Sequence, residues 1–144
     1  MFNKINVLIV CMANFCRSPV AEAILANSTN ENVIIKSAGI LNLKKNHMDH
    51  RSANFLEGLG LSNSHQTTRI DEKILKKSSL IYTFDNKLVE KLRASHPLHH
   101  SKIKLIYEQE ITDPINYLPE KYEENMQTIL KASKKLADKL NSMF

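Results

Sequence analysis

The sequence lacks any apolar run near the ~18–20 residues that a transmembrane helix needs, so we expect no membrane insertion. The first residues, Met1-Phe2-Asn3-Lys4, lead straight into an apolar stretch and leave no room for a signal peptide. We therefore expect a cytoplasmic protein. Repeats, linkers and low-complexity segments are also missing, and a length of 144 residues suits one domain, spanning residues 1–144.

Cysteine is scarce: the chain has two, Cys11 and Cys16, both in one short segment. They cannot form a stapling disulfide framework, and they are too few ligands for a zinc site. Apart from His65, the histidines show no convincing ligand spacing, and the segment 96–100 looks most like a solvated turn. We expect no metal and no other cofactor.

Acidic residues are outnumbered, since 15 Asp and Glu face 20 Lys and Arg and the net charge is +5. This excess favours an anionic substrate. The positive residues are spread along the chain rather than gathered on one short segment, so nucleic-acid binding is the weaker interpretation and we expect no nucleic-acid partner.

The most informative segment is Val7–Pro19, which has the pattern of a buried strand, a six-residue loop and the start of a helix. The thiol of Cys11 and the guanidinium of Arg17 can both face an anion held in the loop between them. The peptide N–H groups and the helix N-terminus point at the same place, and their positive field favours thiolate over thiol. The pattern predicts a phosphate cradle with a nucleophile at its floor. Either cysteine could instead be a buried apolar thiol, and Cys16 could be a redox partner.

Branched apolar segments alternate with amphipathic ones along the chain. We predict strands at 5–10, 33–36, 80–84 and 102–106, and helices at 18–28, 49–59, 71–77, 86–95 and from 119 onward. Ser18 is the expected cap of the first helix, with Pro19 at its first position. The alternation implies an α/β fold, a four-stranded doubly wound parallel sheet with helices on both faces. Its ligand site should lie at the carboxyl ends of the strands, where Cys11 stands.

Cleavage of a phosphate ester by a thiol needs a nucleophile, positive charge on the phosphate oxygens and an acid for the leaving oxygen. Cys11 can attack, the Arg17 fork can hold two oxygens, and the amides of residues 12–17 can bind the rest without a metal. The best candidate for the acid is Asp113, because it follows the fourth strand at the same carboxyl edge and precedes Pro114. Taken alone, an Asp-Pro pair is more typical of a turn than of a catalytic site.

The segment Cys11–Pro19 resembles the active-site loop of the low-molecular-weight protein tyrosine phosphatases, whose pattern is Cys, any residue, Gly, Asn, any residue, Cys-Arg-Ser-Pro after an apolar strand. Ala13 replaces the family glycine, and if that position needs a positive φ the loop must carry strain. The resemblance implies a flavodoxin-like phosphatase fold and hydrolysis of phosphotyrosine through a phosphocysteine. Cys11 would be the nucleophile, Arg17 the phosphate clamp, and Asp113 the general acid and then the base.

The resemblance also implies supporting and substrate-binding residues. Ser37-Ala38-Gly39 is similar to the family's Ser-Ala-Gly, and His65 falls where the family has a histidine that braces the phosphate loop with Asn14, Ser18 and Ser37. Ile115 and Asn116 stand where the family usually has aromatic residues, and Tyr117 follows one step later. The substrate-binding positions that follow are Met12, Ala13, Asn14, Phe15, Cys16, Ser18 and Tyr117.

Within the family, the sequence looks most like the bacterial branch associated with exopolysaccharide or capsule tyrosine kinases, because the acid loop is short and Ile40, Leu41 and Leu43 are aliphatic. The partner would be a tyrosine-phosphorylated protein, such as a tyrosine kinase of polysaccharide export. Three alternatives remain open. They are arsenate reduction, which needs cysteines that this chain lacks after its third strand; a protein arginine phosphatase, which has threonine where Phe15 stands; and a phosphate-binding module without turnover.

Overall fold

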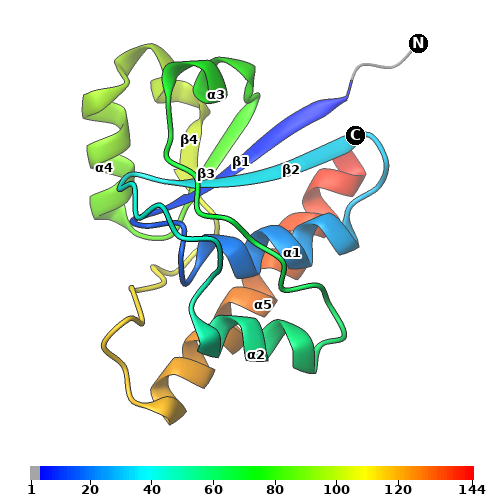
Figure 1. Cartoon of the computed structure of the whole chain (residues 1–144). Helices are drawn as coiled ribbons and strands as arrows, with labels where there is room; N and C mark the ends of the chain where they lie inside the picture. Colours follow the sequence, from blue (N-terminus) through cyan, green and yellow to red (C-terminus); the bar gives the residue numbers. More distant parts are fainter. Residues whose placement is uncertain (1–3) are drawn as a thin grey trace.

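The computed structural model describes residues 4–144, in which each of the four strands is followed by one or more helices (Figure 1). The elements are β1 (Ile5–Cys11), α1 (Ser18–Ser28), β2 (Val33–Gly39), α2 (His50–Gly58), α3 (Glu72–Lys77), β3 (Leu80–Thr83), α4 (Asn86–Ser95), a 3-10 helix (Pro97–Lys102), β4 (Ile103–Leu105) and α5 (Pro119–Met143). Asp49, Asp71 and Asp85 cap α2, α3 and α4, because each side chain accepts a hydrogen bond from a backbone N–H of the first turn.

The four strands form one parallel sheet in the order β2-β1-β3-β4, which confirms the predicted fold class. The chain passes from β1 to β2 on one side and returns to β3 on the other, so the direction of winding changes at β1. Cys11 pairs with Gly39 at the carboxyl ends of β1 and β2. In open α/β sheets, this crevice beside the point of reversal is the usual ligand site.

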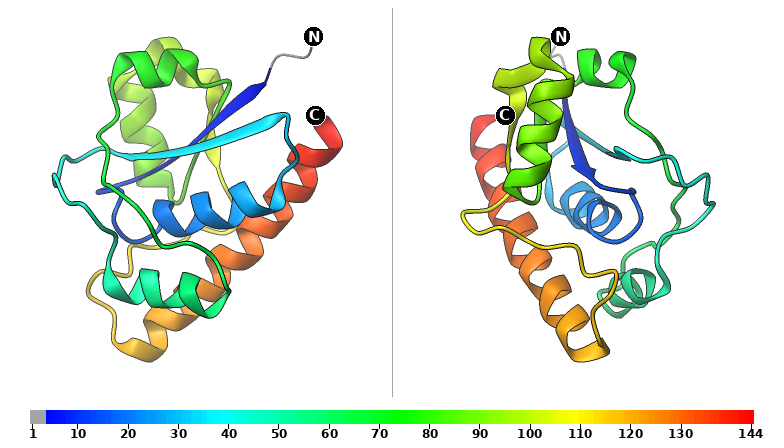
Figure 2. Two further views of the ribbon diagram at one scale, coloured as in Figure 1. Left: turned by 45° about the vertical axis from the view of Figure 1, so that its right-hand side comes forward. Right: turned by 90° about the vertical axis from the view of Figure 1, so that its left-hand side faces the viewer.

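Successive side chains of β1 point to opposite faces of the sheet and build two cores. Val7 and Ile9 pack into a cluster with buried residues of α1, α2 and α5. Leu8 and Val10 pack into a second cluster with buried residues of α3, α4 and the neighbouring strands. The views in Figure 2 show these two groups of helices, separated by the sheet. The sheet is therefore covered on both faces, as predicted.

The long helix α5 runs beneath the sheet and packs its buried stripe against α1, whereas its other side is exposed (Figure 1). Within residues 4–144, neither α5 nor any other helix is long and apolar enough to cross a membrane.

Two local predictions were wrong. Ser18 does not cap α1: it is the first helical residue, Arg17 holds the cap position, and no side chain caps the helix. The reason is that the Ser18 hydroxyl is engaged elsewhere, at 2.9 Å from Cys11 Sγ. The segment 96–100 is largely exposed, as predicted, but it is not a turn: most of it enters the 3-10 helix, and the ring of His99 is buried, with Nε2 2.5 Å from Glu72 Oε1.

Candidate active site

The loop between β1 and α1, residues 12–17, turns its carbonyl groups outward. Five carbonyls of residues 11–16 accept hydrogen bonds of 2.8–3.1 Å from the surrounding protein, and the accepting residues are Cys11, Met12, Asn14, Phe15 and Cys16. The N–H groups of residues 12–17 donate to no protein group in the described part of the chain. With the carbonyls held outside, these N–H groups are left for the interior of the loop. Successive inward N–H groups make an anion-binding concavity.

Asn14 fixes the conformation of this loop. Its φ is +55°, in the left-handed region that asparagine tolerates better than most residues. Its buried side chain donates from Nδ2 to Ser18 Oγ (2.8 Å) and Ser37 Oγ (2.9 Å), and its Oδ1 accepts from the Thr68 N–H (2.9 Å). The positive φ thus falls on Asn14 and not on Ala13, so the strain expected at Ala13 does not arise.

The other three predicted supporting residues, Ser18, Ser37 and His65, come together around Asn14. His65 Nε2 lies 2.9 Å from the Asn14 carbonyl oxygen, and since a carbonyl only accepts, this ring nitrogen carries the proton. Ser37 donates to Glu22 Oε1 (2.6 Å), and His65 Nδ1 lies 3.8 Å from the same oxygen. Glu22, which the sequence analysis did not select, therefore joins Ser37 and His65 behind the loop.

Gly39 allows the loop to lie directly against the end of β2. A Cβ atom at this position would stand 2.6 Å from the Asn14 nitrogen and 2.7 Å from the Ala13 carbonyl carbon, both backbone atoms. Because backbone cannot swing aside as the end of a side chain can, any larger residue would have to push the loop away from the sheet.

We expect Gly39→Ala to displace the loop, with a loss of phosphate affinity and a destabilisation of about 1–3 kcal/mol from overpacking. Inhibition by inorganic phosphate and thermal unfolding measure the two effects. Gly58→Ala is the matched control, because nothing lies within 4 Å of a Cβ added there and alanine favours its helix. Equal behaviour of the two variants would contradict the close approach at Gly39.

Cys11 stands at the floor of the loop, buried, with Sγ 2.9 Å from Ser18 Oγ. The Asn14 amide already donates to this hydroxyl oxygen, so the hydroxyl's own hydrogen is available to the sulfur. The Ser18 hydroxyl can therefore donate a hydrogen bond to the sulfur.

The guanidinium of Arg17 is held from behind. Nη1 donates to Asp85 Oδ2 (3.0 Å) and to the Ile111 carbonyl (2.7 Å), and the group lies over the ring of Phe84, 5.3 Å from its centroid. Only 2% of the side chain is exposed. In the described chain no protein group accepts from Nε or Nη2, so that side of the fork is available to an oxyanion.

Asp113 and Cys11 line the same cavity of about 300 Å³. The other lining residues are Met12, Ala13, Phe15, Cys16, Arg17, Leu41, Leu43 and Ile115. The cavity thus has the phosphate loop on one side and the acid loop, residues 112–117, on the other. Tyr117 is not among the described residues that line it; its hydroxyl is hydrogen-bonded to Thr112 Oγ1, and Ile115 stands at the wall instead.

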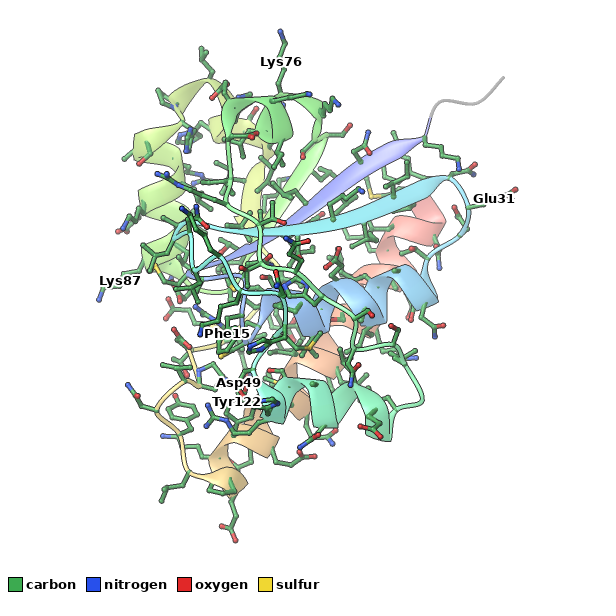
Figure 3. All side chains as sticks on the ribbon, in the orientation of Figure 1. Phe15, Glu31, Asp49, Lys76, Lys87 and Tyr122 are labelled. Atoms are coloured by element: carbon green, nitrogen blue, oxygen red, sulfur yellow. The ribbon has the colours of Figure 1, made fainter. Side chains whose placement is uncertain are left out.

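Cys16 has a different environment from Cys11, beside Asp49 at the start of α2 and Tyr122 of α5, both labelled in Figure 3. Its Sγ lies 3.9 Å from Asp49 Oδ2. Burial raises the pKa of the Cys16 thiol to about 12. At neutral pH Cys16 therefore remains largely a thiol, so it is not the nucleophile that attacks phosphorus.

The sequence model of the low molecular weight phosphotyrosine protein phosphatases matches residues 6–143. The chain belongs to this family. Its relatives include the low molecular weight protein-tyrosine-phosphatase Wzb of Salmonella typhi, 29% identical over 99% of this chain and 97% of the relative. Another is the phosphatase Etp of Escherichia coli strain K12, 26% identical over 94% of this chain and 95% of the relative.

Solved structures agree with this membership. The tyrosine phosphatase Wzb from Escherichia coli K30, solved in complex with sulphate, superposes with a TM-score of 0.86 at 27% identity and covers 97% of this chain and 99% of its own. The YwlE arginine phosphatase from Geobacillus stearothermophilus has a TM-score of 0.91 at 21% identity, covering 96% and 94%, which establishes only the shared fold. Overall shape thus does not separate tyrosine from arginine phosphatases, and the residues of the cavity must do so.

Proposed function

We propose that this low molecular weight phosphatase hydrolyses phosphotyrosine in proteins through a phosphocysteine on Cys11. One observation carries the proposal. Between Cys11 and Arg17 the N–H groups of the loop have no protein acceptor in the described chain, and Cys11, Arg17 and Asp113 line one cavity. A nucleophile, an oxyanion cradle and an acid in one cavity are the parts that phosphoryl transfer to sulfur requires.

In the first step the Cys11 thiolate attacks phosphorus, an S–P bond forms and the P–O bond to the tyrosine ring breaks. Asp113, entering as a carboxylic acid, gives its proton to the leaving phenolate. The N–H groups of the loop and the free side of the Arg17 fork hold the equatorial oxygens, whose charge is spread over all of them in the transition state.

In the second step the Asp113 carboxylate takes a proton from water as the water oxygen attacks phosphorus. The S–P bond breaks, inorganic phosphate leaves and Cys11 returns to the thiolate. The Ser18 hydroxyl, at 2.9 Å from the sulfur, stabilises this leaving thiolate as it stabilised the attacking one. The role of Asp113 reverses between the two steps, as the reversal of proton flow requires.

The wall of the cavity supports an aromatic leaving group. Phe15, Leu41, Leu43 and Ile115 present apolar surface around the phosphate loop. A flat apolar ring is stabilised by burial against such a wall. The guanidinium of phosphoarginine would lose its hydration there, and the apolar side chain of Phe15 offers it no hydrogen-bond acceptor in exchange. The cavity therefore favours phosphotyrosine over phosphoarginine.

The proposed partner is a tyrosine-phosphorylated cytoplasmic protein, such as a tyrosine kinase of polysaccharide export. The support is the similarity in sequence to the bacterial phosphatases Wzb and Etp, together with the aliphatic residues after the Ser-Ala-Gly segment.

Turnover of phosphopeptides that differ only in the phosphorylated residue tests the proposal. We expect the phosphotyrosine peptide to be cleaved faster than the phosphoserine and phosphoarginine peptides, and a rapid acid quench to trap phosphate on Cys11. Preference for phosphoarginine would assign the protein to the arginine phosphatases. Phosphate binding without a covalent adduct would make it a binding module.

Mild peroxide is expected to join Cys11 to Cys16. Oxidation of the Cys11 thiolate gives a sulfenic acid, and attack by the Cys16 sulfur expels water and forms the disulfide. Because the attacking sulfur must ionise and the pKa of Cys16 is raised to about 12, ring closure should accelerate as the pH rises. Intact mass should show loss of a pair of hydrogen atoms, restored by a reductant. Cys16→Ser, the control, should gain oxygen instead, and oxygen adducts alone in both proteins would contradict the pairing.

A further inference from the structure

Arg51, in the first turn of α2, reaches across to the acid loop. Its Nη1 donates to the carbonyl of Tyr117 and its Nη2 to the carbonyl of Ile115, both at 3.1 Å. The guanidinium lies over the ring of Tyr122, 4.0 Å from the centroid. One planar group therefore holds two backbone positions at the end of the loop that carries Asp113.

The same guanidinium is fixed from the side of the phosphate loop. Nε and Nη2 donate to the two carboxylate oxygens of Asp49, at 3.0 and 2.9 Å. Burial opposes ionisation of Asp49, but the hydrogen bonds from Arg51 outweigh it and lower the pKa of this carboxyl. The Asp49 N–H in turn donates to the Phe15 carbonyl (2.9 Å), one of the carbonyls that the phosphate loop turns outward. Figure 3 labels Phe15, Asp49 and Tyr122 around this link.

The acid loop has few other attachments. In the described chain, three hydrogen bonds reach residues 112–117 from outside that segment: one from Asn125 to the Thr112 carbonyl and the two from Arg51. The remaining bonds of the loop are internal, such as that from the Ile115 N–H to Asp113 Oδ1 (3.1 Å). Asn125 thus holds the beginning of the loop and Arg51 its end, with Asp113 between them.

We propose that Arg51 is a positioning residue, which through Asp49 fixes the acid loop relative to the phosphate loop and so aims Asp113 at the leaving oxygen. This inference rests on the proposed role of Asp113 as the acid. Proton transfer needs the donor within hydrogen-bond reach of the oxygen, and a displacement of ~1 Å can lower a rate ~10²-fold. Arg51 bonds no residue of the phosphate loop directly, and the bond from the Asp49 N–H to the Phe15 carbonyl does not need the guanidinium, so we expect phosphate binding to be retained without it.

The test measures phosphoenzyme formation in a single turnover, with a phosphotyrosine peptide and with nitrophenyl phosphate. We expect Arg51→Ala to slow phosphoenzyme formation from the peptide about 10- to 100-fold. Phosphoenzyme formation from nitrophenyl phosphate should slow much less, because a good leaving group needs little help from the acid. Arg51→Lys should lose most of the rate as well, since an ammonium keeps the charge beside Asp49 but cannot span both carbonyls. Inhibition by inorganic phosphate should stay unchanged in both variants.

Two comparisons make the test specific. Lys121→Ala removes a cation that lies 4.5 Å from the ring centroid of Tyr117 without a bond to the loop backbone, and should leave the rate near normal. Adding Arg51→Ala to Asp113→Asn should cost little further, because a positioning residue acts only through the group it positions.

The outcomes separate the inference from the proposed function. If Arg51→Ala abolishes inhibition by phosphate, or slows the reactions of both substrates equally, the substitution acts on the phosphate cradle or on the fold. Either result would overturn the assignment of Arg51 as a positioning residue. Full additivity with Asp113→Asn would also overturn it. If Asp113→Asn itself slows both substrates equally, the proposed acid is wrong. If Asp113→Asn discriminates between them and Arg51→Ala does not, the inference about Arg51 alone fails.

Discussion

Cys11→Ser should abolish turnover and leave phosphate binding intact. A serine hydroxyl is not ionised at neutral pH, so the attacking group is lost, and removal of a nucleophile costs on the order of 10⁶-fold in kcat in a well-studied protease. The inward N–H groups and the Arg17 fork do not depend on the sulfur, because the carbonyls of the loop are held by residues outside it. Inorganic phosphate should therefore still bind.

The measurement is steady-state release of phosphate together with titration by inorganic phosphate. A phosphate ester on the introduced hydroxyl would have a poor leaving group in the second step, so it yields at most one equivalent of product. Cys16→Ser is the control: it changes the other loop sulfur, which lies beside Asp49, but keeps the backbone N–H that residue 16 offers to the phosphate, so turnover should be retained. A steady-state rate within about tenfold of the parent would refute Cys11 as the nucleophile, because loss of a nucleophile costs far more.

Local patterns were sufficient to predict the fold and the centre of the site. The strand–loop–helix sequence of residues 7–19 contains both its own secondary structure and the two groups that face an anion, so Cys11 and Arg17 could be found without knowledge of distant contacts. The alternation of strands and helices then restricted the sheet to parallel pairing, which brings the residues after β4 to the same edge as those after β1. That position made Asp113 a candidate, and the resemblance to the phosphatase family selected it, although its role stays a prediction.

Contacts through space could not be predicted in the same way. Arg51 occupies an ordinary position in an amphipathic helix, and nothing in its neighbours along the chain indicates bonds to residues 64 and 66 positions away. Asp85 caps α4, and nothing near it in the sequence indicates that it also accepts a hydrogen bond from Arg17. Ser18 is a residue type that commonly caps helices, but its hydroxyl forms a hydrogen bond with the sulfur of Cys11 instead of capping α1. In each case a side chain with a familiar local role is used by a segment far away in sequence.

Asp113→Asn should slow cleavage of phosphotyrosine by ~10²–10⁴-fold at the step that forms the phosphocysteine. The asparagine amide keeps the size and can keep the hydrogen bond that Oδ1 accepts from the Ile115 N–H, so the loop should stay folded. What it loses is the proton. A phenolate whose conjugate acid has a pKa near ~10 leaves poorly without one, and this requirement accounts for the size of the effect.

The same substitution should slow nitrophenyl phosphate much less at this step, because nitrophenolate is already stable as an anion and gains little from protonation. The rates must be compared as phosphoenzyme formation in a single turnover, since loss of the base would also slow hydrolysis of the intermediate and so depress steady-state rates for both substrates alike. In a multiple-turnover experiment with nitrophenyl phosphate, the variant should release a burst of nitrophenolate and then turn over slowly, as the phosphocysteine accumulates. Equal single-turnover losses on the two substrates, with no burst, would remove Asp113 from the acid role and leave another donor to be found among the residues that line the cavity.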